Sequence, residues 1–177
     1  LCAKQQGAMI ASQLRRVGID FSFAIAKGRQ RYLCLSKLDM RIQDAEVTAP
    51  VSLFPDEDQR VSKTSVEQLK LLSSSFAAKD WDGDRDRWTE SLNREDWQLV
   101  AADRISCSGK KCTHYHQCPL FSARDDIRKV DVVIANHDLV LADLAAGGGN
   151  ILPDPQQSIF VFDEAHHLPE KSRSHLV

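Results

Sequence analysis

The chain has 177 residues, of which 42% are hydrophobic and 27% are charged, so it is long enough and apolar enough to bury a hydrophobic core. These proportions exclude collagen-like, mucin-like and disordered chains. No apolar run reaches the roughly 20 residues of a membrane-spanning helix, and the first residues lack the apolar stretch of a signal peptide. We therefore expect a soluble intracellular polypeptide. Its start at Leu1 and its end at Val177, within an expected helix, suggest a piece of a longer protein.

The net charge of −2 conceals an uneven distribution of charge along the chain. Residues 1–37 carry seven Lys and Arg against one Asp, a balance of +6, whereas residues 38–100 carry eight against fourteen acids, a balance of −6. For nucleic-acid binding, the clustering of cations on one face matters more than the net charge. The sequence is therefore compatible with a nucleic-acid partner, and the alternative is that these charges only solvate the surface.

The first half of the chain predicts helices around one short strand. Hydrophobic periodicity and the positions of Pro and acidic residues set the expected limits. The expected elements, in chain order, are an amphipathic helix at 5–16, a buried strand at 21–26, a basic loop at 27–31, a helix at 32–45 with Cys34 near its start, a loop at 48–58, a helix at 64–79 and an irregular stretch at 80–94.

The second half predicts an alternation of strands and helices after a loop that contains three cysteines. The expected elements are a helix at 119–129, an apolar central strand at 131–135, a helix capped by Asn136 that runs to Leu144, a loop at 147–155 and a second buried strand at 158–162. Strand, helix and strand with short connections imply a parallel α/β sheet. The cysteine region would be an insertion that projects from this sheet.

Two carboxylates, Asp163 and Glu164, directly follow the second predicted strand in the sequence IFVFDEAH. Open α/β sheets bind ligands beyond the carboxyl ends of their strands, so this position favours nucleotide chemistry. Asp163 would hold Mg²⁺ through water, Glu164 would polarise the water that attacks the γ-phosphate, and His166 would sense the nucleotide state. The alternative is a charged helix start, because acidic residues favour the first turn of a helix.

The phosphate-binding loop of an ATPase site is absent from these residues. That loop needs the pattern G-x-x-x-x-G-K-S/T, and none of the eight glycines is followed by Lys-Ser or Lys-Thr. The sequence thus carries the acidic half of an ATPase site without the phosphate-binding half. We expect these residues alone to hydrolyse ATP at background.

Five cysteines in a chain without secretory features argue against a disulfide framework. Cys107, Cys112 and Cys118 lie close enough along one loop to converge on a metal centre, and Cys34 is a plausible fourth ligand. Four thiolates suit either tetrahedral Zn²⁺ or a [4Fe–4S] cluster. The absence of a C-x₂-C pair favours the cluster, and Cys2 is expected to take no part.

Two histidines, His114 and His116, keep a mixed Cys/His zinc site open as an alternative, although a lone histidine in a loop is more often a surface residue. A further alternative is that the three loop cysteines occur together by chance.

Four stretches together resemble the bacterial DinG helicases, which are iron–sulfur enzymes of helicase superfamily 2 related to the eukaryotic helicase XPD. They are KGRQRYLC (27–34), CSGKKCTHYHQCPLFSARDDI (107–127), VDVVIANHDLVLADL (130–144) and ILPDPQQSIFVFDEAHHLPE (151–170). The resemblance covers nearly the whole chain and is weak from about residue 40 to residue 95.

The resemblance implies an α/β fold, in which part of a RecA-like parallel-sheet motor domain carries a mainly helical iron–sulfur insertion. Residues 1–31 and 129–177 would belong to the motor domain and residues 32–128 to the cluster domain. Cys34, Cys107, Cys112 and Cys118 would match the [4Fe–4S] ligands, Asp163 the Mg²⁺-binding acid and Glu164 the hydrolytic base. The arch domain and the second motor domain of such enzymes have no counterpart in these residues.

The implied activity is that of an ATP-dependent 5′-to-3′ DNA helicase of repair and replication, acting on D-loops, R-loops and forked duplexes. The expected partners are single-stranded and forked DNA and DNA–RNA hybrids. We expect the protein to be a monomer and to lie in the bacterial cytoplasm near the nucleoid. We expect DNA phosphates to bind to five basic residues, Lys27, Arg29, Arg31, Lys110 and Lys111. We expect a DNA base to stack on Tyr115. The competing hypothesis is a non-enzymatic, zinc-stabilised module for DNA binding or redox sensing.

Overall fold

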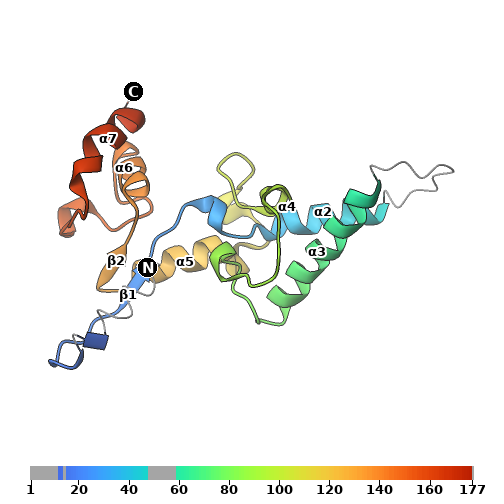
Figure 1. Ribbon diagram of the computed structural model, residues 1–177, viewed down its shortest axis with the longest axis horizontal. Coiled ribbons are helices and arrows are strands. Elements are labelled where there is room, and N and C mark those ends of the chain that lie inside the picture. Colours follow the sequence, from blue (N-terminus) through green and yellow to red (C-terminus); the bar gives the residue numbers. More distant parts are fainter. Residues whose placement is uncertain (1–11, 14, 48–58, 177) are drawn as a thin grey trace. The chain divides into compact units, whose positions relative to one another are not determined.

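The computed structural model, shown in Figure 1, describes residues 12–13, 15–47 and 59–176. The chain divides into two compact units, one formed by residues 1–28 with 123–177 and the other by residues 29–122. We call them the sheet unit and the cysteine unit. The elements are β1 (Phe23–Ile25), η1 (Arg29–Arg31), α2 (Leu35–Val47), α3 (Gln59–Ala77), η2 (Arg85–Arg87), α4 (Arg94–Val100), η3 (Gly109–Lys111), η4 (Tyr115–Gln117), α5 (Pro119–Ile127), β2 (Val132–Ile134), α6 (His137–Ala145), η5 (Pro155–Gln157), η6 (Ala165–His167) and α7 (Leu168–Leu176).

The sheet unit is built on two parallel strands, β1 and β2, which confirms the predicted α/β class. In the register of this pair, Phe23 lies opposite Val132. Parallel neighbours cannot be joined by a hairpin and need a long crossover connection. Here that connection contains the whole cysteine unit, so the cysteine-bearing residues are an insertion between two paired strands.

A reciprocal set of hydrogen bonds between Ser22 and Asp131 marks the start of the strand pairing. The Asp131 carboxylate accepts from the Ser22 backbone N–H at 2.8 Å and from the Ser22 hydroxyl at 2.7 Å. In return the Asp131 backbone N–H donates to the Ser22 hydroxyl oxygen at 3.1 Å. Because these two residues directly precede β1 and β2, their exchange fixes the register of both strands.

Helix α6 follows β2 and is capped as the sequence predicts. The Asn136 side-chain oxygen accepts from the Leu139 backbone N–H at 2.9 Å. At the other end of the helix, the buried carboxylate of Asp143 accepts from the backbone N–H groups of Ile151 at 2.8 Å and Leu152 at 3.3 Å. These bonds compensate the burial of a charge and hold the glycine-rich loop against the helix.

The predicted strand at 158–162 is wrong, because the structure has no strand there. Side chains that a central strand would bury are exposed instead, at 95% for Ile159 and 90% for Val161. A parallel strand is stable only when neighbouring strands satisfy its backbone groups and cover its apolar faces. Among the described residues β1 and β2 pair only with each other, so the apolar segment finds no partner.

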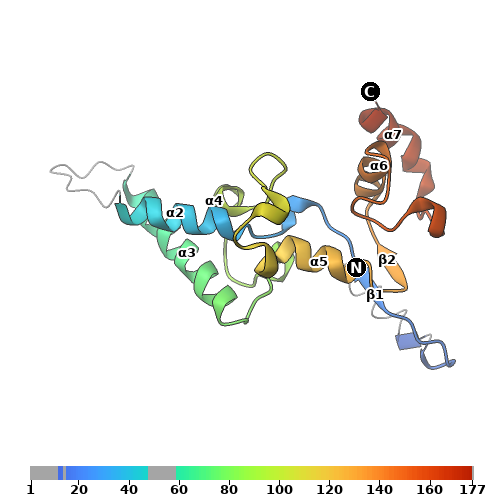
Figure 2. The ribbon, with the colours of Figure 1, turned by 180° about the vertical axis from the view of Figure 1, so that it is seen from behind.

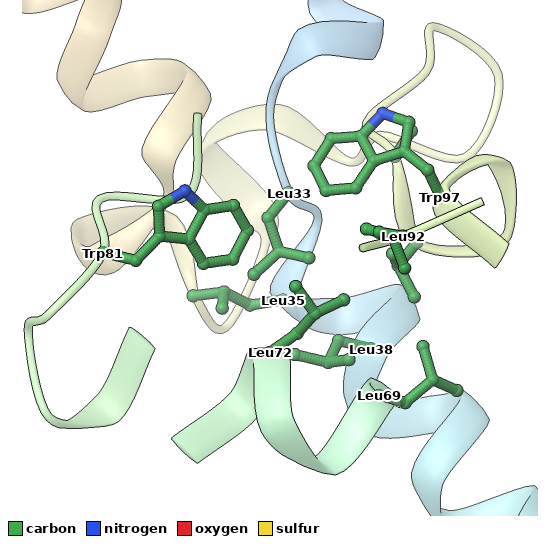
Figure 3. Packing of buried hydrophobic residues seen from close by; sticks show 10 residues of the cluster. Leu33, Leu35, Leu38, Leu69, Leu72, Trp81, Leu92 and Trp97 are labelled. Carbon is green, nitrogen blue, oxygen red and sulfur yellow. The ribbon is translucent and has the colours of Figure 1, made fainter. Parts of the chain in front are cut away.

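The cysteine unit has its own hydrophobic core, which lies between α2, α3 and α4 (Figure 3). Helices α2 and α3 lie side by side in both ribbon views (Figures 1 and 2). Leu33 and Leu72 are completely buried at the centre of this core, and Trp81 and Trp97 close it at the sides. Burying a leucine contributes about 1.5–3 kcal/mol, so this core is a main source of the stability of the cysteine unit.

The start of the predicted helix at 32–45 needs correction, because α2 begins only at Leu35. Tyr32 and Leu33 form antiparallel bridges with Asp84 and Ala101 instead. Pairing with distant backbone therefore overrides the helical pattern in the turn before Cys34, a tertiary effect that local periodicity does not report.

One short helix, α4, was not predicted from the sequence. Its cap is local: the Asn93 side chain accepts from the Asp96 backbone N–H at 2.7 Å and donates to the Asp96 carboxylate at 2.7 Å. An Asn followed three residues later by an acid is a helix-start signal, so the motif Asn93-Arg-Glu-Asp96 would have revealed the helix. The preceding stretch at 80–94 is mainly irregular, as predicted, apart from η2.

The remaining predicted elements agree to within a few residues where the structure describes them. Helix α3 covers most of the predicted 64–79, and α5 and α6 match the predictions at 119–129 and after Asn136. The predicted loop at 48–58 and most of the helix at 5–16 lie outside the described residues. In the part of the chain that the structure describes, no helix is long and apolar enough to cross a membrane.

Candidate functional site

Cys34 is fixed between an extended segment and the first turn of α2. Its backbone N–H donates to the Val100 carbonyl at 2.8 Å, and its own carbonyl accepts from Leu38 N–H at 3.0 Å. The flanking residue Ala102 donates to Tyr32 at 2.9 Å, which extends the same pairing. The segment that leads toward Cys107 is therefore aligned with the residues that carry Cys34, although 73 positions separate the two cysteines.

The approach to Cys107 is organised by the carboxylate of Asp103. One carboxylate oxygen accepts from the backbone N–H groups of Ile105 and Ser106, both at 2.7 Å, and the other accepts from the Ser106 hydroxyl at 2.8 Å and from the Lys37 ammonium. The hydrogen bond from Lys37, followed by those from Ser106, holds the pKa of Asp103 well below its usual range. Asp103 thus ties α2, just after Cys34, to the turn just before Cys107.

Cys112 and Cys118 end two similar turns. Each follows a short 3₁₀ helix and donates its backbone N–H to the carbonyl of the first residue of that helix. Cys112 follows η3 and donates to Gly109 at 3.0 Å, and Cys118 follows η4 and donates to Tyr115 at 3.3 Å. Both cysteines then leave the turn in an extended conformation. Repeating one turn presents two thiols from equivalent positions on successive loops, which is a suitable arrangement for ligands of one centre.

The Cys118 thiol lies near enough to two of the other thiols to interact with them electrostatically. Burial raises the pKa of the Cys118 thiol, and the nearby thiols of Cys34 and Cys107 raise it further, while backbone hydrogen bonds from Phe121 and Leu120 oppose the rise. All four described cysteines are half-buried and none forms a disulfide. Sulfur atoms that share an electrostatic environment become thiolates most easily when a cation binds among them.

Four cysteine thiols form the donor set of this region. Among the described residues, these thiols do not form a group of three close ligand atoms. Four thiolates are the donors that both a [4Fe–4S] cluster and a tetrahedral Zn²⁺ ion take, so the donor chemistry fits either centre.

The two loop histidines have other contacts. His114 Nε2 lies 3.1 Å from the Asp39 carboxylate on α2, and the His116 ring lies edge-on to Tyr115 at 5.6 Å. In the part of the chain that the structure describes, neither imidazole belongs to a group of three close ligand atoms. His114 therefore links the cysteine loop to α2.

The residues expected to meet DNA are distributed over both units. Lys27 belongs to the sheet unit, Arg29 and Arg31 to η1, and Lys110 and Lys111 are exposed in η3. Arg31 pairs with Asp86 at 3.2 Å. The half-buried ring of Tyr115 packs on Phe121, with 4.8 Å between ring centroids.

The acidic box forms an exposed turn in the sheet unit. Asp163 accepts from the Glu164 backbone N–H at 2.9 Å, and Glu164 adopts a left-handed conformation with φ of 50°. The Glu164 carboxylate lies 3.3 Å from His166 Nδ1, and the rings of His166 and His167 lie 3.9 Å apart between centroids with their planes tilted by 42°. The three predicted nucleotide residues are thus adjacent and accessible, but they follow an extended segment instead of the predicted strand.

Sequence reasoning missed Lys37 and Asp103, which the structure places between two of the predicted ligands. Asp103-Arg-Ile-Ser106 carries a local signal, because an aspartate that accepts from the N–H groups two and three residues ahead forms a turn. Its bond to Lys37 has no local signal, since 66 positions separate the two residues.

Comparison with known proteins adds an independent observation. The DEAD_2 family model matches residues 82–176. The chain is 40% identical over 157 residues, 87% of its length, to "ATP-dependent DNA helicase DinG" of Photobacterium profundum, and covers 22% of that protein. It is 33% identical over 165 residues, 92% of its length, to the proteins of the same name in Escherichia coli K12 and Salmonella choleraesuis, and covers 23% of each.

The matched family region begins at residue 82 within the cysteine unit and ends at residue 176 in α7. It therefore includes three of the predicted ligands and the whole acidic box. The chain spans less than a quarter of the length of these relatives. Since the match covers more than half of the chain, the chain belongs to the DEAD_2 family.

Proposed function

We propose that these residues form part of an ATP-dependent 5′-to-3′ DNA helicase and contribute its [4Fe–4S] region and its acidic box. The observation that carries the proposal is the insertion of a four-cysteine unit between two paired parallel strands, in a chain that matches DNA helicases over most of its length. The sheet unit then corresponds to part of the first motor domain and the cysteine unit to the cluster domain. The boundaries expected at residues 32 and 128 lie close to this division.

Cys34, Cys107, Cys112 and Cys118 would hold the cluster. Their thiols are half-buried and form no disulfide, and the absence of a C-x₂-C pair in the sequence favours the cluster over one zinc ion. When bound, the cluster supplies a covalent junction between distant segments and a centre able to exchange one electron. The chain itself positions the ligands, through the pairing of Cys34 with Val100 and through the bonds of Asp103.

Asp163 and Glu164 would act on the nucleotide in the longer protein. Asp163 would hold a Mg²⁺-bound water, and Glu164 would accept a proton from the water that attacks the γ-phosphate. His166, within 3.3 Å of Glu164, would hold that carboxylate in place and respond to the nucleotide state. The phosphate-binding loop and the second motor domain would come from segments beyond these residues.

The DNA-binding surface would include Lys27, Arg29, Arg31, Lys110 and Lys111, with Tyr115 placed to stack on a base. We propose single-stranded and forked DNA, including D-loops and R-loops with their DNA–RNA hybrids, as substrates in the bacterial cytoplasm near the nucleoid. A monomer would suffice for this activity.

Metal analysis of the anaerobically purified chain tests the cluster. We expect a brown protein with about four irons, absorption near 400 nm and loss of both in Cys112→Ser, whereas Cys2→Ser keeps them. A colourless protein with one zinc would support the zinc-stabilised DNA-binding or redox module instead. Full iron content in Cys112→Ser would refute the ligand assignment.

Nucleotide turnover tests the acidic box in the longer protein. Glu164→Gln should abolish DNA-stimulated ATP hydrolysis while nucleotide binding remains, because the amide cannot accept the proton. Robust hydrolysis by the 177 residues alone would contradict the proposal that the phosphate-binding loop lies elsewhere.

A further inference from the structure

A cavity of about 790 Å³ opens on the cysteine unit beside η1, η2 and α4. Its volume lies within the range of roughly 300–1,000 Å³ that is typical of sites for small molecules or single nucleotides. Its lining is rich in cations and tryptophan, among them Arg31, Lys37, Arg85, Arg94, Trp88 and Trp97. All of the lining residues belong to the cysteine unit, whereas the acidic box belongs to the sheet unit.

The walls of the cavity carry an excess of positive charge. Four basic residues face two acids, Asp86 and Asp103, which leaves two positive charges over. Arg31 pairs with Asp86, but both side chains are about half exposed, and such pairs contribute little and exchange easily for another anion. Arg94 makes no ion pair with any acid among the described residues. An anionic ligand would therefore meet Arg94, which has no acidic partner among the described residues, and Arg31, whose ion pair with Asp86 is weak.

An aromatic and guanidinium surface adjoins these cations. The Arg85 guanidinium lies 5.6 Å from the Trp97 ring centroid and is held by a hydrogen bond of 2.7 Å to the Leu92 carbonyl. A guanidinium held in this way presents a flat cationic face, on which a planar ring can stack. Phosphate-binding cations beside a stacking face match the two parts of a nucleotide.

Trp88 is the indole best able to rearrange around such a ring. The N–H groups of Trp81 and Trp97 donate to backbone carbonyls of Asp84 and Gln30, at 2.8 Å and 2.7 Å. By contrast, the buried N–H of Trp88 has no acceptor among the described residues. Moving Trp88 therefore breaks no hydrogen bond, whereas moving either of the other two indoles breaks one.

We infer that this cavity binds one nucleoside together with the two phosphates next to it, with the base against Trp88 and Arg85 and the phosphates on Arg94 and Arg31. A single strand of nucleic acid and a free nucleotide share this chemistry. We take the strand as the source because the two excess charges match two successive phosphates, and this choice rests on the proposed DNA-binding function. Of these four residues only Arg31 is among those proposed above to meet DNA, and Arg85, Arg94 and Trp88 are additional.

Salt titrations on the 177-residue chain, purified anaerobically, test the site with fluorescein-labelled dT15. Each phosphate contact with a single strand contributes about 0.7 to the slope of log affinity against log salt. Arg94→Gln should therefore flatten the slope by about 0.7 and weaken binding about fivefold at 0.1 M salt. Arg41→Gln is the matched control, because Arg41 is exposed on α2 of the same unit and does not line the cavity.

A second measurement is independent of the charge change. dT15 that carries 5-iododeoxyuridine should crosslink on irradiation to Trp88, as located by mass spectrometry of the peptides. Competition with dTMP distinguishes the two sources of ligand. Displacement of dT15 by dTMP at equal phosphate concentration, lost in Arg94→Gln, would support the site with a free nucleotide as its occupant.

The failures of the inference and of the proposed function are distinguishable. If the unaltered chain binds dT15 but Arg94→Gln and Arg41→Gln have the same slope and no crosslink reaches Trp88, the cavity is not the site and DNA binding stands. If the unaltered chain does not bind dT15 at low salt, both the cavity and the proposed DNA contacts of this chain are refuted.

Discussion

Lys37 donates a hydrogen bond to Asp103 and joins the helix that follows Cys34 to the turn that precedes Cys107. Asp103 in turn accepts from two backbone N–H groups and one hydroxyl of that turn. The contact therefore connects two proposed metal ligands through one carboxylate. It makes the ligand geometry depend on residues that are not ligands themselves, as is general for metal sites.

Removal of the Asp103 carboxylate should loosen the proposed cluster without removing one of its proposed ligands. In Asp103→Ala the turn before Cys107 loses all its side-chain bonds, so we expect faster loss of absorption near 400 nm in the presence of an iron chelator. Asp103→Asn, which can still accept from the backbone, should lie between Asp103→Ala and the unaltered chain. Glu67→Gln, on the exposed surface of α3, is the control. Equal rates for Asp103→Ala and Glu67→Gln would show that Asp103 does not position Cys107.

The core of the cysteine unit should respond to truncation at Leu72 but not at its neighbour. Leu72 is completely buried and Leu71 is 44% exposed. We expect Leu72→Ala to lower the free energy of unfolding by about 2–5 kcal/mol, because it leaves a cavity in the core. Leu71→Ala should change that free energy by no more than about 0.5 kcal/mol. Urea unfolding followed by tryptophan fluorescence measures both, and similar losses for the two variants would contradict the packing in Figure 3.

The exposed apolar segment at 159–162 should behave differently in the longer protein. Val161→Asp should leave the urea midpoint of the 177-residue chain unchanged, because Val161 is 90% exposed there. In the longer protein, if neighbouring strands cover the segment, the same change buries a charge and should cost at least about 2 kcal/mol. Ile105→Asp is the control, because Ile105 is fully exposed in a loop and should be neutral in both proteins. A neutral Val161→Asp in the longer protein would show that the segment is not a central strand.

The strand pairing should weaken in acid through Asp131. Hydrogen bonds from the Ser22 backbone N–H and hydroxyl lower the pKa of the Asp131 carboxyl below 3.8. Because the pKa in the folded state is the lower one, this stabilisation is fully present above about pH 3.8 and is lost as the pH falls through the folded pKa. The Val132 amide donates to Ser22 at 3.0 Å, so its hydrogen-exchange protection factor reports the pairing.

The protection factor of Val132 should therefore fall as the pH is lowered below about 3.8 in the unaltered chain, and should depend less on pH in Asp131→Asn. Asp125→Asn removes a carboxylate that lies on the exposed end of α5 and should leave the pH dependence intact. An identical pH profile in Asp131→Asn and the unaltered chain would assign the acid sensitivity to other groups.

The sequence by itself determined the features that depend on neighbouring residues. The strand patterns of β1 and β2, the cap at Asn136 and the limits of α5 and α6 follow from local periodicity and side-chain chemistry. The grouping of Cys107, Cys112 and Cys118 in one loop and the order of Asp163, Glu164 and His166 are also visible in the sequence. These features set the α/β class and the family resemblance.

Only the tertiary structure decided the features that depend on distant residues. Helix α2 starts at Leu35 because Leu33 pairs with Ala101, and the turn before Cys107 is held from α2 by Lys37. The segment at 158–162 has the composition of a strand but remains unpaired, since a strand forms only where another strand completes its hydrogen bonds. The cavity beside Trp88 likewise brings together four separate segments. In each case the deciding free energy comes from contacts between residues far apart in the chain, which no local pattern encodes.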